Sequence, residues 1–272
     1  MIDAALPYLR CPVCEDTLSR PLGGQTLRCG RGHSFDLARQ GYAALAAGRL
    51  PHAGDTAEMI AARDSFLTAG HYSFIAEALE DAAAGCSTEG VVLDAGVGTG
   101  YYLGRALDRR AGAAGLGLDV SKPALRRAAR AHPRAAAALA DVWQRLPLAA
   151  DSAGLVLNVF APRNGPEFHR VLRAGGALLV VTPAAGHLRE LIDAYGLIQV
   201  DPDKAARVSG SLGEQFTVEG AVTVERRLRL SGDEVRTLVG MTPSARHVAV
   251  DDLPKDEVEL TAAVDVTVHR PL

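Results

Sequence analysis

The chain has 272 residues, of which 48% are hydrophobic, and a formal net charge of −3. This length and composition can build a full globular core with a small second domain. No segment approaches the roughly 18 consecutive apolar residues of a membrane span, and the N-terminus lacks the basic and then apolar pattern of a signal peptide. We therefore expect a cytoplasmic protein without membrane contact, in which any RNA binding depends on local arginine patches rather than on net charge.

The N-terminal segment carries three of the four cysteines at a metal-binding spacing. Cys11 and Cys14 form one pair, and Cys29 with His33 forms a second pair about 15 residues later. Two such pairs complete a tetrahedral zinc site, and metal binding would stabilise the short ribbon of strands predicted there. The alternative is a redox Cys-x2-Cys motif, but that motif usually opens a helix of a βαβ unit, which does not surround this segment. Four protein ligands close the site, which disfavours catalysis at the metal.

After a connecting stretch that ends near Gly54, the sequence pattern changes to helices and then to alternating strands and helices. The predicted helices cover residues 57–67, 73–84, 101–110, 123–131, 166–172 and 233–239. The predicted strands cover residues 91–95, 115–118, 154–159, 176–181, 222–230 and 260–269. Alternation of strands with helices predicts a parallel sheet covered on both faces, to which the last two strands are added as a pair.

The strand at 91–95 runs directly into the loop Gly96-Val-Gly-Thr-Gly100, which a helix follows. Ligands of open α/β sheets bind at this carboxyl end, and glycine lets the backbone approach them closely. The G-x-G-x-G spacing, with Tyr101 after the last glycine, differs from the G-x-G-x-x-G fingerprint of dinucleotide sites. We therefore expect Gly96, Gly98 and Gly100 to hold a nucleotide-like cofactor other than NAD.

Three acidic residues identify the cofactor more closely. Asp94 precedes the glycine loop and can hold the cationic amino group of methionine, which NAD lacks. Asp119 ends the next strand, where a carboxylate can accept both ribose hydroxyl hydrogens. Asp141, with Val142, follows the third strand where such folds meet an adenine, although a helix cap or a surface acid is the alternative for Asp141. Together these residues favour S-adenosylmethionine.

The zinc quartet, the glycine loop and several short segments together resemble the RlmA-type 23S rRNA guanine-N1 methyltransferases over nearly the whole chain. Asp141-Val-Trp143 and Leu157-Asn-Val-Phe-Ala-Pro-Arg-Asn164 are most similar to the actinobacterial tylosin-resistance (TlrB) branch of this family. The other matching segments are His33-Ser-Phe-Asp36, Gly41-Tyr42, Gly54-Asp55, Met59-Ile-Ala-Ala-Arg63, Gly70-His-Tyr72, Leu118-Asp-Val-Ser-Lys-Pro123, Thr182-Pro183 with His187-Leu188, and Met241-Thr-Pro243.

This resemblance implies an α/β fold, a Rossmann-like class I methyltransferase with a mostly parallel seven-stranded sheet over residues 51–272. A small zinc-ribbon domain over residues 1–50 would precede it and help to grip RNA. The implied reaction transfers a methyl group from S-adenosyl-L-methionine to N1 of a guanine in a 23S rRNA hairpin near the macrolide-binding exit tunnel, with antibiotic resistance as a consequence in the family. The family's zinc ligands fall on Cys11, Cys14, Cys29 and His33.

The resemblance also assigns cofactor contacts. They fall on Tyr72, Thr99, Gly100 and His187. Considered without the family, Tyr72 is more typical of a core or helix-start aromatic, and His187 is more typical of a polar residue at a helix start.

The target guanine must be drawn out of its hairpin into a pocket, and methyl transfer then requires chiefly alignment of the reacting atoms. The exit of the fourth strand is where such a pocket would form. We expect Asn158 to hydrogen-bond the base edge, Phe160 to stack on the base, and Arg163 to engage O6 or a phosphate. Phe160 could instead be a buried core aromatic, and no general base can be named. In the zinc segment, Arg28 and Arg31 are candidate phosphate contacts.

One departure from the family is Arg246, which stands where a tryptophan usually follows the Met-Thr-Pro segment. If that tryptophan contacts the substrate, a paralogue that methylates a small natural product is a second hypothesis, because a fold does not determine its substrate. A third hypothesis is a non-catalytic RNA-binding protein, which the intact glycine loop, Asp94 and Asp119 disfavour. The sequence leaves open which guanine is modified, whether the protein forms a homodimer, and whether resistance follows.

Overall fold

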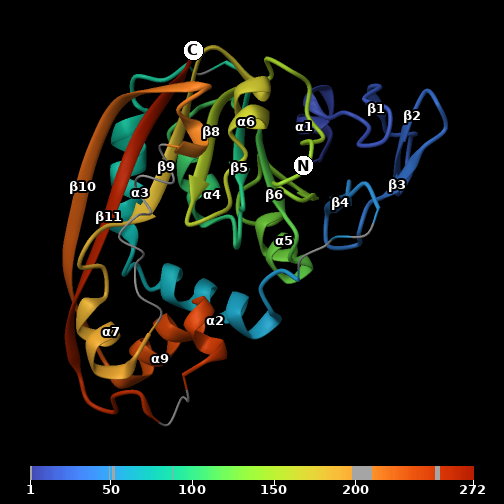
Figure 1. The fold of residues 1–272 in the computed structure, drawn as a ribbon. Helices are drawn as coiled ribbons and strands as arrows, with labels where there is room; N and C mark the ends of the chain where they lie inside the picture. Colours follow the sequence, from blue (N-terminus) through green and yellow to red (C-terminus); the bar gives the residue numbers. More distant parts are fainter. Residues whose placement is uncertain (1, 49, 51–52, 88, 198–209, 249–251) are drawn as a thin grey trace.

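The computed structural model describes residues 2–48, 50, 53–87, 89–197, 210–248 and 252–272. At its centre lies a sheet of eight strands in the order β10-β11-β9-β8-β5-β6-β7-β4 (Figure 1). Strands β4 to β9 run parallel, whereas β11 pairs antiparallel with both β9 and β10. The strands are β4 Tyr42–Ala44, β5 Val91–Ala95, β6 Gly115–Asp119, β7 Ala135–Leu139, β8 Ala153–Val159, β9 Leu172–Pro183, β10 Phe216–Leu230 and β11 Val258–Pro271. The expected mostly parallel sheet is confirmed, and the expected tail pair is present and antiparallel.

The sheet has one strand more than the seven expected. The additional strand, β4, lies within the stretch expected to connect two domains, and it pairs in parallel with β7. Strand β7 has the sequence AAAAL, and all five of its residues are buried. Alanine favours helices, so the strand conformation of this segment depends on its pairing with β6 and on packing against both faces of the sheet.

Helices cover both faces of the sheet, and each expected helix is present. The helices are α1 Ile2–Ala5, α2 Ala57–Thr68, α3 Ser73–Ala83, α4 Tyr101–Asp108, α5 Lys122–Ala128, α6 Gly165–Val171, α7 Arg189–Tyr195 and α9 Gly232–Gly240, with short 3-10 turns η1 Leu6–Tyr8 and η2 Pro243–Arg246. Helix α7 follows the carboxyl end of β9 and was not expected. Helices α2, α7 and α9 lie together beyond the carboxyl edge of the parallel strands (Figure 1). The side chain of Arg246, the residue that departs from the family pattern, lies outside the part of the structure that is described.

Two hydrophobic clusters fill the two faces. One contains Ile75 of α3 and Leu103 of α4 against the inward side chains of β5, β8 and β9. The other contains Phe168 of α6 and, from the N-terminal segment, Leu9 and Leu27. None of the helices formed by the described residues is long and apolar enough to cross a membrane.

The zinc segment packs directly on the sheet layer. Its three strands, β1 Leu18–Ser19, β2 Thr26–Cys29 and β3 Ser34–Asp36, form a separate antiparallel sheet. Leu9 forms an isolated bridge with Leu148, the Arg10 amide donates to the Pro147 carbonyl at 2.9 Å, and the Ala149 amide donates to the Tyr8 carbonyl at 2.8 Å. The apolar core of the ribbon is therefore continuous with that of the large sheet, and a domain boundary at residue 50 stays a prediction.

Leu9→Ala should destabilise the whole protein, because Leu9 is fully buried in the cluster shared by the ribbon and the sheet. We expect a loss of about 2–5 kcal/mol in the free energy of unfolding, measured by urea denaturation of the full-length chain. Leu22→Ala is the matched control, since Leu22 lies in the same segment and is fully exposed. Its effect should stay within about 0.5 kcal/mol, and equal losses in the two variants would contradict the shared core.

Candidate metal centre and active site

The four expected metal ligands lie together at the base of the ribbon. The ligand atoms of Cys11, Cys14, Cys29 and His33 all lie within 4.8 Å of one another. Cys14 Sγ is 3.7 Å from Cys29 Sγ, and Cys11 Sγ is 3.5 Å from His33 Nδ1. Two thiolates about 2.3 Å from a tetrahedral zinc ion are themselves roughly 3.8 Å apart. The residues present therefore fit zinc, with His33 Nδ1 as the nitrogen ligand.

Two tight turns produce this geometry. In the first, the Glu15 amide donates to the Cys11 carbonyl at 2.8 Å, and Glu15 takes a positive φ of 64°. In the second, the Gly32 amide donates to the Cys29 carbonyl at 3.1 Å, and Gly32 has a φ of 86°. Each turn bends the chain so that both of its ligand side chains point to the same side, which is why the ligands are spaced by two and by three residues.

The glycine loop forms a cradle at the carboxyl end of β5. Gly96, Gly98 and Gly100 all have positive φ, a conformation that residues with a Cβ rarely adopt. A Cβ on Gly96 would lie only 2.4 Å from Ala161 Cβ. The Gly98 amide donates to Asp119 Oδ2 at 2.9 Å, which ties the loop to the end of β6. The bond to Asp119 thus fixes the shape of the loop at the point where β5 ends.

Asp94 is a strongly perturbed carboxyl group of the crevice. Its side chain is 2% exposed, and Oδ1 has no hydrogen-bond partner among the described residues. Burial, and then the nearby charge of Asp119, raise the pKa of Asp94 to about 8. A buried carboxyl with an unused oxygen favours a cationic ligand, because a positive charge would compensate both the burial and the like charge.

Asp119 and Asp141 lie at the ends of neighbouring strands. Asp119 accepts from the amides of Gly98 and, at 2.8 Å, of Ser121, and burial raises its pKa. Asp141 accepts from the Trp143 amide through Oδ1, while its buried Oδ2 has no partner in the described chain. Val142 and Thr99 are also buried. The structure therefore brings the expected ribose and adenine residues to one edge of the sheet.

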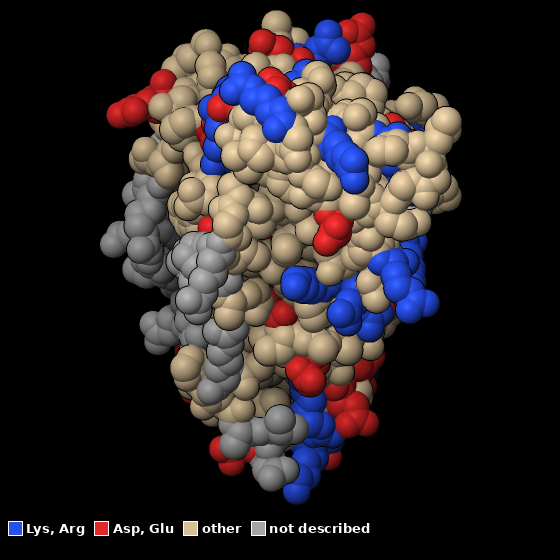
Figure 2. Space-filling model, turned by 90° about the vertical axis from the view of Figure 1, so that its right-hand side faces the viewer, with Lys and Arg blue, Asp and Glu red and all other residues tan. Residues whose placement is uncertain are grey.

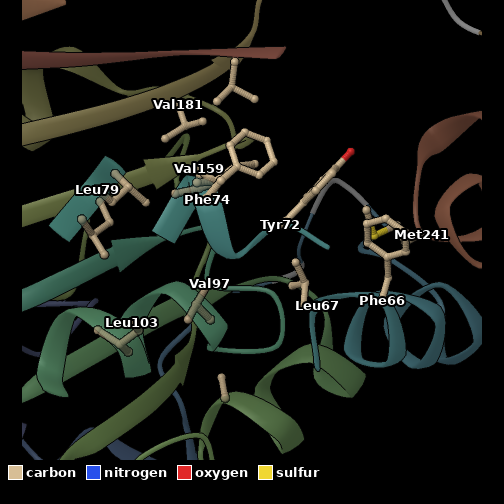
Figure 3. Close-up of a cluster of buried hydrophobic side chains, with 14 of the residues drawn as sticks. Phe66, Leu67, Tyr72, Phe74, Leu79, Val97, Leu103, Val159, Val181 and Met241 are labelled. Carbon is tan, nitrogen blue, oxygen red and sulfur yellow. The ribbon is translucent and has the colours of Figure 1, made fainter. Parts of the chain in front are cut away.

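Three aromatic rings form a row at this edge. The Tyr72 ring centroid lies 6.3 Å from that of His187, which lies 6.2 Å from that of Phe160. Tyr72 is buried against Phe66 and Phe74, with its hydroxyl directed away from the apolar side chains around it (Figure 3). His187 Nδ1 accepts from the Ala263 amide at 3.2 Å. The two residues assigned only by resemblance are thus neighbours of each other and of the expected substrate residue Phe160.

Phe160 is not a core aromatic. Its side chain is 42% exposed, and its backbone has a φ of 52°, an unusual value for a residue with a Cβ. The Phe160 amide donates to the Val181 carbonyl at 3.1 Å. Strained backbone of this kind is found preferentially at functional sites, where the surrounding structure holds it.

Asn158 and Arg163 occupy different places. Asn158 is fully buried; its Nδ2 donates to the carbonyls of Ala95 and Pro162, while Oδ1 has no partner among described residues. Arg163 is half-buried, and desolvation lowers its pKa. Its charge also contributes, after burial, to lowering the pKa of His269 of β11. Arg163 is therefore near another basic side chain, whereas Asn158 lies beside the end of β5.

The crevice contains two further residues that the sequence pattern did not indicate as functional. Arg63 of α2 forms an ion pair with Asp55 at 2.7 Å, donates to the Met241 carbonyl at 2.8 Å, and lies against Gly98. Tyr102 has a buried hydroxyl without a partner among the described residues, and its pKa is raised by burial and then by neighbours that include Tyr72. Arg63 could have been noticed in the segment Met59–Arg63, but no pattern distinguishes Tyr102 from Tyr101 before the helix face is known.

A cysteine–histidine ribbon joined to a glycine-loop crevice at the carboxyl edge of this sheet defines a class I methyltransferase with an N-terminal zinc ribbon. Residues 9–47 match the family described as "RlmA, N-terminal", and residues 92–176 match the family described as "Methyltransferase domain". The chain is 47% identical to the 23S rRNA (guanine(748)-N(1))-methyltransferase of Streptomyces fradiae, over 97% of each chain. It is 53% identical to a protein of Micromonospora griseorubida named as a 23S rRNA (guanine-N(1)-)-methyltransferase, over 98% of each chain. The chain belongs to the family of 23S rRNA (guanine-N1)-methyltransferases.

Solved structures of low sequence identity support the fold alone. The MccD protein superposes with a TM-score of 0.50 at 14% identity, covering 73% of this chain and 96% of its own. A chain from the complex of the Haloferax volcanii Trm112 methyltransferase activator with a methyltransferase has a TM-score of 0.50 at 18% identity, covering 80% of this chain and 98% of its own. Fold and family together confirm the predicted enzyme class and its two cofactors, S-adenosyl-L-methionine and Zn2+.

Gly96→Ala should abolish tight cofactor binding, because the new methyl group would collide with Ala161 in a backbone conformation that alanine avoids. We expect the affinity for S-adenosylmethionine to fall by at least about tenfold in titration calorimetry. Gly112→Ala is the control, since Gly112 has a φ of 78° and no atom within 4 Å of the Cβ that alanine would add. It carries the backbone penalty without the collision, so equal binding by both variants would contradict the cradle.

Proposed function

We propose that this enzyme transfers a methyl group from S-adenosylmethionine to N1 of a guanine in a 23S rRNA hairpin. The observation that supports this most strongly is the combination, in one chain, of the Cys3His ribbon, the cofactor crevice and near-complete alignment with relatives named for this reaction. The name of the Streptomyces fradiae relative specifies guanine 748. A guanine in the macrolide-binding exit tunnel, a cytoplasmic setting, a homodimer and macrolide resistance stay predictions for this chain.

In this proposal the methyl group would pass from the sulfonium of S-adenosylmethionine to guanine N1, the N1 proton would leave to solvent, and the sulfur would become a neutral thioether. The protein binds and orients the two reactants. Asp94 holds the cationic amino group of the methionine portion. Asp119 accepts from the ribose hydroxyls, while Asp141 and Val142 meet the adenine. Tyr72, Thr99, His187 and the three loop glycines complete the cofactor contacts. Alignment of this kind accounts for much of the rate of a displacement reaction, so no covalent intermediate with the protein is needed.

The flipped guanine would enter beside Phe160, whose exposed ring is available for stacking. The Watson–Crick edge of guanine presents two donors, N1–H and the exocyclic amine. Asn158 could accept from this edge through Oδ1, because its Nδ2 is already used by two backbone carbonyls. Arg163 remains a candidate for O6 or a phosphate.

The zinc ribbon would contact the RNA backbone. Arg28 is exposed on β2. The side chain of Arg31 is 68% exposed, and its Nε lies 3.2 Å from Asp16 Oδ2. The face of the molecule on the ribbon side shows several separate groups of Lys and Arg side chains with acidic side chains between them (Figure 2). Such scattered groups suit the positioning of an irregular RNA hairpin better than tracking along a long duplex.

The reaction can be tested with labelled S-adenosylmethionine and unmodified 23S rRNA. We expect label in the RNA and a single primer-extension stop, because N1-methylguanine cannot pair during reverse transcription. The same RNA bearing adenosine at the mapped position is the control and should take up no label. Cofactor binding without incorporation into RNA would instead support the small-molecule hypothesis, and failure to bind the cofactor would support the non-catalytic one.

Cofactor affinity should depend on pH through Asp94. With its pKa raised to about 8, free Asp94 is mostly protonated at pH 6 and must lose this proton to meet the ammonium group. Affinity should therefore rise between pH 6 and 8 and fall again above pH 8, where the amino group of the cofactor, with a pKa of about 7.7–8.0, loses its charge.

Calorimetry in buffers of different ionisation enthalpy should show release of about one proton per cofactor bound at pH 6. Asp94→Asn is the diagnostic variant and should bind weakly without this proton release. If the variant releases the same number of protons as the natural protein, Asp94 is not the group that meets the cation.

A further inference from the structure

Trp143 is an exposed aromatic on a rigid loop between the cofactor crevice and the zinc ribbon. It is the only tryptophan of the chain, and its side chain is 55% exposed. Among the described residues, the large exposed hydrophobic side chains include only two aromatics, Trp143 and Phe160. Both follow the carboxyl ends of parallel strands, β7 and β8, where ligands of such sheets bind.

The backbone around Trp143 is held on both sides. Its amide donates to Asp141 Oδ1 at 3.0 Å. Asn164, the N-cap of α6, donates through Nδ2 to the carbonyls of Val142 at 3.0 Å and Gln144 at 3.2 Å. The ring is thus presented to solvent from a fixed turn, so little conformational entropy would be lost when it meets a partner.

The loop that carries Trp143 continues directly to the ribbon. Arg145 forms an ion pair with Glu15 at 2.6 Å, one residue beyond the zinc ligand Cys14. Pro147 and Leu148 then contact Arg10 and Leu9 through the backbone. The segment from Asp141 to Arg145 therefore lies between the crevice and the ribbon, where it is available to an RNA that contacts both.

We propose that Trp143 is a stacking platform for an RNA base that neighbours the target guanine. This inference rests on the proposed function and adds a substrate-positioning contact to it. Nucleobases stack on exposed aromatic rings irrespective of sequence, and tryptophan presents the largest ring surface. Phe160 would receive the flipped guanine, and Trp143 would hold the strand beside it. The cofactor adenine is a less suitable occupant, because the crevice side of this turn is formed by the buried Asp141 and Val142.

As the sole tryptophan, Trp143 reports on its own environment by fluorescence. The full-length protein is titrated with a transcribed 23S rRNA fragment that spans the guanine mapped by primer extension, and separately with S-adenosylmethionine. We expect saturable quenching by the RNA and none by the cofactor alone. Quenching by the cofactor without a further change on RNA addition, or RNA binding in a filter assay without any fluorescence change, would overturn the proposal.

Variants separate stacking from other roles. Trp143→Ala should weaken RNA binding roughly 5- to 100-fold, and Trp143→Phe should restore most of the affinity. Both should leave cofactor affinity and the salt dependence of RNA binding unchanged, because no phosphate contact is removed. Val222→Ala, at an exposed position of β10, is the control for loss of surface apolar area. If the natural protein binds and methylates the RNA while Trp143→Ala binds it equally well, only this inference fails. If the natural protein neither binds nor methylates the RNA, the proposed function itself fails.

Discussion

A ribbon of three short strands cannot bury enough apolar surface to fold alone, and this constraint organises the N-terminal part of the molecule. The ribbon meets it in two ways, through a zinc site and through packing of Leu9 and Leu27 into the cluster beneath the large sheet. The second solution fixes the position of the ribbon relative to the loop that follows β7. Because that loop begins at Asp141 and ends against Arg10, metal site and cofactor crevice share one rigid frame.

Packing of the ribbon against the large sheet gives the zinc site a structural role in the catalytic domain as well. Closed coordination suggests a ribbon that only grips the substrate. The backbone bonds from Tyr8 and Arg10 to the loop at 147–149 show that it also supports a wall of the catalytic domain. The distance between the ribbon and the crevice is therefore fixed before RNA binds. Recognition of the RNA then requires no movement of the ribbon relative to the crevice.

The features that the sequence predicts are those whose signal lies within a few neighbouring residues. The glycine loop, Asp94 and Asp119 were found because turn chemistry and strand ends leave marks within a few residues. The third strand, β7, was expected before Asp141 without a residue range, because a run of alanines favours helix until neighbouring strands pair with it. Strand β4 has only three residues and no alternation to detect. Only the family resemblance indicates Tyr72 and His187 as cofactor contacts. Their rings come from distant segments of the chain and become neighbours only in the folded protein. Tyr102 required the face of α4 to be known.

The electrostatics of the crevice follow from the same geometry. Asp94 and Asp119 are buried near each other, so ionisation of both is disfavoured in the free protein, and the folded state holds a proton on Asp94 that the unfolded chain would lose above about pH 4. Stability is therefore lost as pH rises from about 4 towards 8, the range between the unfolded and folded pKa values of Asp94. A bound cation would stabilise the ionised carboxylate of Asp94 and so offset the cost of its burial. The crevice is thus least stable when empty and most complementary to a ligand that brings a positive charge to Asp94.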